Sequence, residues 1–174
     1  MVKIVSQKTV YETRWIKVVD LQIEFSKTTQ NFQIVEKNDS AMIVPVTNDG
    51  KLILIKEYFA ASNSYLLTFP KGRVDEGEDP QSTIIRELQE EAGFKPQKVK
   101  LLTSLLVSPG YLKQKTFVYL CRDLVESSME GDEGEKPEVK TFTFDEVEKM
   151  IESGEIQEAR VIAAFYLTKK HLKK

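Results

Sequence analysis

One predicted helix, Pro80–Ala92, stands between two blocks of strand-like sequence, and this order constrains the fold more than any other feature. Asp79 suits the cap position, Pro80 suits the first helical position, and Gly93 can end the helix in the left-handed conformation. The flanking sequence predicts strands at Lys3–Thr13, Ile16–Phe25, Asn31–Lys37, Ala41–Val46, Lys51–Phe59, Lys98–Val107, Lys115–Arg122 and Lys140–Phe144, and helices at Asp145–Glu152 and Gln157–Lys170. This order predicts an α+β fold, a mixed α/β sandwich and not a doubly wound sheet.

Length and charge exclude several classes of protein. The chain has 174 residues, close to the length of one domain. Its 25 basic residues against 27 acidic residues lack the basic excess that drives nucleic-acid binding, so no nucleic-acid partner is expected. The apolar runs are far shorter than the roughly 20 residues of a membrane helix. The single cysteine, Cys121, cannot form an intrachain disulfide, so we expect a cytoplasmic protein with no membrane partner.

The central helix is crowded with carboxylates. At about 100° per residue, its apolar residues form one stripe, and Glu87, Glu90 and Glu91 share a single arc beside that stripe. Like charges at these spacings repel one another. Two interpretations fit the helix alone. It is either a solvated acidic face with one ion pair between Arg86 and Glu90, or a site for a hard divalent cation such as Mg²⁺ or Mn²⁺.

The residues around this helix have a fixed spacing. Gly72 is followed after five residues by Glu78 and after seven more by Arg86–Phe94, which reads Arg-Glu-Leu-Gln-Glu-Glu-Ala-Gly-Phe. The pattern resembles the Nudix box, G-x5-E-x7-R-E-U-x-E-E-x-G-U with U an apolar residue, at every specified position. Seven positions require one residue type each, so a chance match is below about one in a million. The resemblance implies the Nudix α/β/α sandwich, with a loop–helix–loop that binds a divalent metal and a nucleoside-diphosphate-linked substrate.

The resemblance also implies roles for individual residues. Glu87 and Glu91 are expected to ligate the metal, together with the main-chain carbonyl of Lys71. Glu90 is expected to act in catalysis, either as a ligand or by positioning water. Arg73 is expected to contact the substrate. The structural residues of the motif are Gly72, Glu78, Arg86 and Gly93. The oppositely charged pair among them is expected to lock the loop to the helix.

Beyond the motif, much of the chain resembles the ADP-compounds hydrolases and ADP-ribose pyrophosphatases within this superfamily. The similar stretches are Ala41–Pro45, Leu52–Tyr58, Ser128–Glu133 and Glu158–Arg160. The resemblance implies hydrolysis of ADP-ribose, diadenosine oligophosphates or NADH at the diphosphate, with release of AMP. It also implies that residues 1–40 form an antiparallel sheet for homodimerisation, while residues 41–174 form the Nudix domain.

Two alternatives to this function remain. ADP-ribose pyrophosphatases often carry an Arg and a Glu where this chain has Glu57–Ala60 and Thr68–Gly72, so the broader range of ADP compounds is favoured. The first alternative is hydrolysis of another nucleoside-diphosphate-linked compound, such as a nucleotide sugar. The second is a catalytically silent module that binds a nucleotide, which the intact motif glutamates argue against.

Three further segments are candidates for the site. The acidic segment Glu126–Glu138 would by composition be a solvated loop, yet it resembles the loop that supplies the catalytic base in ADP-ribose pyrophosphatase-like enzymes. This likeness implies Glu133 as the base and Glu135 as a further metal ligand. The turn of Ser108, Pro109 and Gly110 is a candidate substrate-binding loop. Trp15 is expected to pack in the core or in a dimer interface in preference to stacking on a base.

Overall fold

The structure is a computed structural model that describes residues 1–131 and 137–173. Its strands are β1 (Lys3–Glu12), β2 (Lys17–Glu24), β3 (Thr29–Glu36), β4 (Ser40–Pro45), β5 (Leu52–Phe59), β6 (Ser64–Thr68), β7 (Lys71–Arg73), β8 (Phe94–Leu106), β9 (Leu112–Lys113), β10 (Lys115–Glu126) and β11 (Glu138–Phe142). Its helices are α1 (Pro80–Glu87), the π-helical segment η1 (Leu88–Ala92), α2 (Phe144–Glu152) and α3 (Ala159–Leu172). Within these ranges, no helix combines the length and the apolar character needed to cross a membrane.

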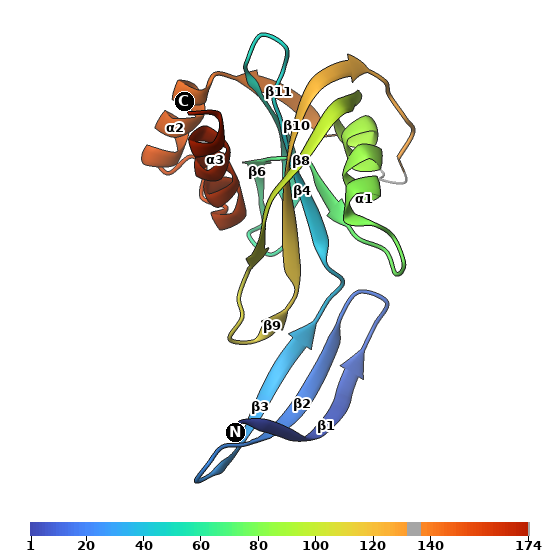
Figure 1. Ribbon diagram of the computed structural model, residues 1–174, viewed down its shortest axis with the longest axis vertical. Helices are drawn as coiled ribbons and strands as arrows, with labels where there is room; N and C mark the ends of the chain where they lie inside the picture. Colours follow the sequence, from blue (N-terminus) through green and yellow to red (C-terminus); the bar gives the residue numbers. More distant parts are fainter. Residues whose placement is uncertain (132–136, 174) are drawn as a thin grey trace.

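The body of the protein is a sandwich of helices around strands, as predicted. One sheet has the order β7-β4-β10-β8, and a second has the order β11-β5-β6. At the centre, β4 and β10 are parallel, with Ala41 opposite Phe117. Helix α1 lies on one side of the sheets, and α2 and α3 lie on the other (Figure 1). The expected α+β sandwich is therefore confirmed.

The core lies on both faces of β4, which is buried along its whole length. Successive side chains of a strand point to opposite faces. Met42 accordingly belongs to the apolar cluster that includes Phe165 of α3, and Ile43 belongs to the cluster that includes Ile84 of α1. Cys121 lies in the second cluster, where burial raises the pKa of its thiol to about 12. That thiol is therefore protonated at neutral pH and is a packing group, not a nucleophile.

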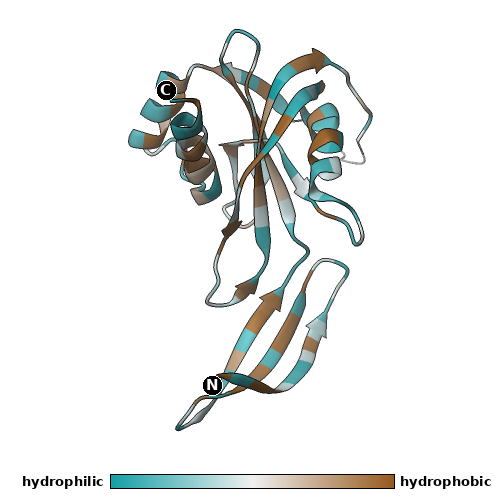
Figure 2. Cartoon of the chain, in the orientation of Figure 1, coloured by the Kyte–Doolittle hydropathy of each residue, from teal (hydrophilic) through white to brown (hydrophobic). Residues whose placement is uncertain are grey.

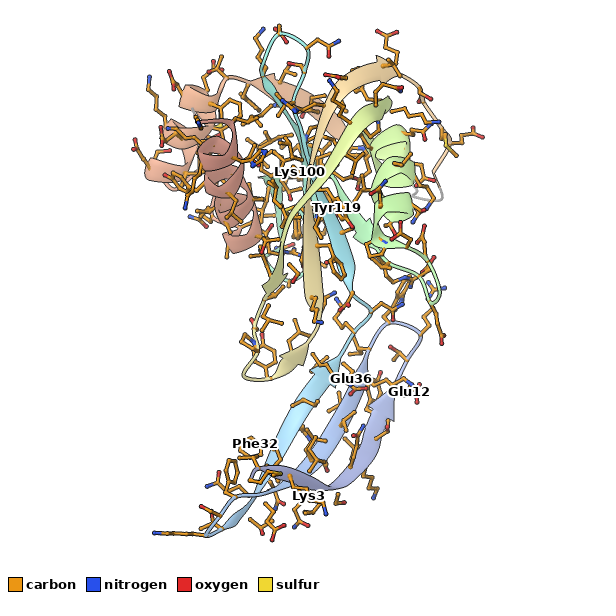
Figure 3. All side chains as sticks on the ribbon, viewed as in Figure 1. Lys3, Glu12, Phe32, Glu36, Lys100 and Tyr119 are labelled. Carbon is orange, nitrogen blue, oxygen red and sulfur yellow. The ribbon has the colours of Figure 1, made fainter. Side chains whose placement is uncertain are left out.

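A separate sheet, with the order β1-β2-β3-β9, extends away from the body (Figure 1). Strand β1 is exposed along its entire length, on both faces of the sheet. Figure 2 shows hydrophobic residues distributed along these strands, and Figure 3 shows their side chains, including Phe32, projecting from the ribbon. Apolar surface on this sheet is thus left uncovered by the chain's own core.

The structure differs from the sequence prediction in two respects. The predicted helix Pro80–Ala92 is α-helical only to Glu87, and its last turn is a π-helix. The short strands β6, β7 and β9 were not predicted, because five, three and two residues are too few to show a clear strand pattern. In β7, Gly72 also favours a loop over a strand. β7 pairs with β4 through Lys71 and Met42, which brings the first residues of the motif against the central sheet.

Candidate active site

The C-terminal half of the motif helix turns Glu90 and Glu91 out of the α-helical register. Gly93 adopts φ +79° and donates its N–H to the carbonyl of Leu88, five residues back. π-helical turns are rare in proteins, and those that occur often lie at functional sites. Gly93 therefore ends the helix as predicted. Asp79 occupies the cap position, but its side chain makes no capping hydrogen bond.

Glu87 lies directly against the main chain of Gly72. A Cβ atom added to Gly72 would lie only 1.9 Å from Oε1 of Glu87 and 2.5 Å from its Cγ. No other residue type fits there without moving the carboxylate. Glu87, a residue only 9 % exposed, is thereby held against the main chain of Gly72.

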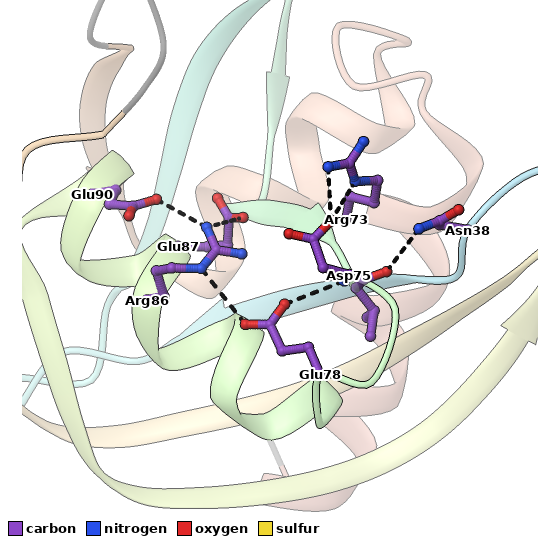
Figure 4. Close-up of polar contacts among 8 residues, drawn as sticks. Asn38, Arg73, Asp75, Glu78, Arg86, Glu87 and Glu90 are labelled. Atoms are coloured by element: carbon purple, nitrogen blue, oxygen red, sulfur yellow. Dashed lines mark hydrogen bonds and ion pairs between the residues drawn. The ribbon is translucent and has the colours of Figure 1, made fainter. Parts of the chain in front are cut away.

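Arg86 connects the loop to the helix through three carboxylates (Figure 4). Its Nη1 donates to Glu87 at 2.8 Å and to Glu90 at 3.1 Å, and its Nε lies 3.6 Å from Glu78. Burial alone would lower the pKa of Arg86, but the charges of Glu87, Glu78 and Glu90 outweigh it and raise that pKa. The structure thus brings Glu78 and Arg86 together as expected, and it also contains the Arg86–Glu90 pair.

The loop before the helix is held by its own polar contacts. The main-chain N–H of Asp75 donates to Glu78 at 3.2 Å, and Arg73 forms an ion pair with Asp75 at 2.7 Å (Figure 4). Asn38 donates to the carbonyl of Val74 at 3.3 Å. These bonds fix the loop between β7 and α1 over the site.

Glu91 is the most buried carboxylate of the motif, at 5 % exposure. Its Oε2 accepts a hydrogen bond of 3.0 Å from the main-chain N–H of Lys71. The side chain of Lys71 in turn forms an ion pair with Glu57 of β5. The same two-residue stretch of β7, Lys71 and Gly72, therefore contacts both Glu87 and Glu91.

The charge balance of this group suits a divalent cation. Glu78, Glu87, Glu90 and Glu91 carry four negative charges, and Arg86 offsets one, so three remain in excess. Among the described residues, no three His, Cys, Asp or Glu side chains already stand close enough together to hold a metal. Carboxylate and carbonyl oxygens are nevertheless the ligands that hard cations prefer. Glu87, Glu91 and the carbonyl of Lys71 therefore fit a divalent metal by their chemistry.

A cleft of about 500 Å³ opens beside these residues. It is lined by Trp15, Lys37, Asn38, Ser40, Lys71, Gly72, Arg73, Asp75, Arg86, Glu87, Gln114 and Arg160. Trp15 is 53 % exposed, and the guanidinium groups of Arg14 and Arg73 lie 4.3 and 4.8 Å from its ring centroid. Trp15 therefore does not pack in the core, because the turn between β1 and β2 carries it to the cleft. Its expected place in a dimer interface stays a prediction. Sequence reasoning missed Lys37, Gln114 and Arg160 as lining residues, since only long-range folding brings them there.

The other candidate residues lie elsewhere. Ser108, Pro109 and Gly110 form the turn before β9, and the carbonyl of Ser108 accepts hydrogen bonds from Tyr111 and Leu112. This turn adjoins β3 of the N-terminal sheet. Glu133 and Glu135 lie outside the described residues.

The chain that leads toward Glu133 contacts the motif helix. Gln89 donates to Oγ of Ser127 at 2.8 Å, and the N–H of Met129 donates to the carbonyl of Gln89 at 3.2 Å. A Cβ atom added to Gly131 would lie 3.4 Å from the Cβ of Glu90. Residues 127–131 thus run along the carboxylate end of the helix.

Comparisons with known proteins agree with this geometry. A family model described as the NUDIX domain matches residues 36–165. The ADP compounds hydrolase NudE of Escherichia coli (strain K12) is 34 % identical over 98 % of this chain and 92 % of its own length. The ADP-ribose pyrophosphatase of Bacillus subtilis (strain 168) is 30 % identical over 85 % of this chain and 83 % of its own. A crystal structure of an ADP compounds hydrolase superposes with a TM-score of 0.90 at 32 % identity, covering 99 % of this chain and 94 % of that one.

Nudix hydrolases generally require a divalent metal, which is the kind of ion that the buried glutamates fit. The family match covers most of the chain and contains the whole motif from Gly72 to Phe94. The chain belongs to the family of Nudix pyrophosphohydrolases.

Proposed function

We propose that this protein hydrolyses the diphosphate linkage of ADP-linked compounds such as ADP-ribose, diadenosine oligophosphates or NADH, releasing AMP, with Mg²⁺ or Mn²⁺ as cofactor. The observation that carries the proposal is the position of the buried Glu87 carboxylate, which lines a cleft that Arg73, Arg160 and Trp15 also line. Cationic groups suit a diphosphate, and an exposed aromatic ring suits a base. Relatives similar over most of this chain are named for ADP compounds and for ADP-ribose.

The residues of the site have distinct roles in this reaction. Glu87, Glu91 and the carbonyl of Lys71 would hold the metal, which supplies charge neutralisation and polarisation of the phosphorus centre. Arg86 restrains Glu87 and Glu90. Glu90 lies beside the ligands and would ligate or position the attacking water.

The base and the remaining ligand are proposed from the sequence. Glu133 would remove the proton from the attacking water, and Glu135 would be a further metal ligand. The contacts of Ser127 and Met129 with the helix support a path of the chain toward Glu90 at this point. The single buried cysteine is compatible with a reducing, cytoplasmic setting.

The experiment that tests this function is a substrate panel with product analysis. The protein is incubated in Mg²⁺ with ADP-ribose, diadenosine triphosphate, NADH and two nucleotide sugars, and the nucleotide products are separated by chromatography. The proposal expects AMP from the ADP-linked compounds, at the highest rate for at least one of them. Hydrolysis of the nucleotide sugars alone would support the alternative substrate class. No hydrolysis of any compound would support a silent binding module.

Replacing Trp15 with Ala is expected to raise KM about tenfold while kcat stays within a few-fold. Stacking of a base on an aromatic ring contributes roughly 1–3 kcal/mol, and the Trp15 ring lines the cleft. Steady-state kinetics with the best ADP-linked substrate measures the effect. Tyr166→Ala is the control, because Tyr166 is an exposed aromatic residue of α3 that does not line the cleft. An unchanged KM for Trp15→Ala would contradict stacking at this ring.

We also propose that residues 1–40 mediate a homodimer. Both faces of β1 are exposed, and this strand carries the exposed apolar side chains of Ile4, Val5, Val10 and Tyr11. Apolar surface that stays exposed in the single chain does not stabilise it, whereas a second copy packed on this sheet would bury that surface. The same sheet is flanked by the turn of Ser108, Pro109 and Gly110. We propose that this turn binds substrate by reaching the cleft of the second copy in the dimer.

Light scattering at micromolar concentration is expected to give about twice the chain mass of 19.9 kDa. Replacing Ile4 and Val10 with Lys should shift the protein toward the monomer, because charged groups would then be buried at the interface. A wild-type protein that is monomeric and fully active would contradict the dimer.

A further inference from the structure

The ion pair between Glu57 and Lys71 has no counterpart in the Nudix motif, yet it joins the motif to the neighbouring sheet. Glu57 belongs to β5 and Lys71 to β7, so the pair links strands of two different sheets. The Lys71 side chain is only 12 % exposed, and Glu57 is 35 % exposed. The Lys71 ammonium also lies 4.7 Å from the ring centroid of Phe59, two residues beyond Glu57 on the same strand. Glu57 and Phe59, both on β5, therefore hold the side chain of Lys71 in place.

The main chain of Lys71 is the part that matters for the site. Its N–H donates to Oε2 of Glu91, and the next residue, Gly72, has Glu87 packed against its main chain. A small shift of this stretch would therefore move both buried carboxylates. Since the Lys71 side chain is fixed by β5, the position of its main chain depends on that anchor.

Stability alone gives little reason for such a pair. The cost of removing two charges from water offsets much of the attraction within a partly buried ion pair. A pair of apolar residues in the same place often gives a protein of equal stability. A role in fixing geometry is a better account. Groups that orient metal ligands from outside the coordination sphere change metal affinity by about 10–100-fold when they are replaced.

We infer that Glu57 is a positioning residue that acts through Lys71 to hold Glu87 and Glu91 in the arrangement that binds the divalent metal. The inference rests on the proposed function only in that these glutamates are taken as the ligands. It extends the site to a strand outside the motif.

The test measures Mn²⁺ binding to the purified protein without substrate, by titration calorimetry or by the paramagnetic signal of free Mn²⁺. Glu57→Gln is expected to weaken binding about tenfold. The matched control is Glu148→Gln, which removes the same charge from a comparably exposed ion pair with Lys169 between α2 and α3. The control should bind Mn²⁺ as tightly as wild type, even if both variants lose similar thermal stability.

A double-mutant cycle separates positioning from a general loss of charge. Lys71→Gln should weaken Mn²⁺ binding as much as Glu57→Gln does, and the double variant should be no weaker than either single one, because all three break the same anchor. Circular dichroism verifies that each variant is folded. Wild-type affinity in both folded single variants would overturn the inference while leaving the metal site intact. Failure of the wild-type protein to bind Mn²⁺ would instead overturn the proposed metal site, and this inference with it.

Discussion

Replacing Glu91 with Gln is expected to lower kcat for the best ADP-linked substrate by at least ~10²-fold, or about 2.7 kcal/mol of transition-state stabilisation. The amide keeps the size of the side chain but removes the charge that a hard cation requires. Glu91 is the most buried glutamate of the motif, and the amide oxygen of the variant can still accept the hydrogen bond from the N–H of Lys71. Glu87→Gln should behave in the same way, since Glu87 lines the cleft itself.

The measurement is steady-state hydrolysis over a range of Mg²⁺ concentrations. Glu152→Gln serves as the control, because Glu152 is an exposed carboxylate at the end of α2, outside the candidate site. It should retain the wild-type rate. Near wild-type rates for both Glu87→Gln and Glu91→Gln at saturating Mg²⁺ would show that these two residues are not the ligands.

Gly72→Ala is expected to reduce kcat by ~10²-fold while costing only about 1–3 kcal/mol of stability. The added methyl group cannot share space with the Glu87 carboxylate, which would lie 1.9 Å from it. The end of a glutamate side chain can swing aside, so the fold survives. The Glu87 carboxylate, however, then leaves its position against the main chain of Gly72.

Chemical denaturation measures the loss of stability in Gly72→Ala, and steady-state kinetics measures its loss of kcat. Gly110→Ala is the control for stability, because a Cβ atom there would meet nothing within 4 Å and the main chain is unstrained. It should unfold like the wild type or slightly later. A Gly72→Ala protein with full activity would contradict the role of Glu87 in this position.

The sequence predicted the local parts of the site well. The contact of Arg86 with Glu78 was expected from the resemblance to the Nudix box, and its contact with Glu90 follows from their i, i+4 spacing on the helix. Helical spacing fixes such neighbours before any tertiary structure forms. The long N-terminal strands were also predicted, because β-branched and aromatic residues dominate them.

The parts that depend on long-range packing could not be predicted. A helical wheel with a constant angle per residue cannot represent the π-turn at Leu88–Ala92. The cleft gathers Trp15 and Arg160 from opposite ends of the chain, and only the packed fold brings these two residues together. The pairing of Glu57 with Lys71 depends on how two sheets meet, which no spacing along the sequence encodes.

The most direct test of the account is the Mg²⁺ dependence of AMP release from ADP-ribose by the wild-type protein, with Glu91→Gln assayed beside it. The account predicts that AMP and ribose 5-phosphate appear together, that chelation of Mg²⁺ abolishes both, and that the variant releases at most about one-hundredth as much per unit time. AMP release that persists after complete chelation, or that is equal in the Glu91→Gln variant, would contradict a metal-dependent hydrolase built on this glutamate.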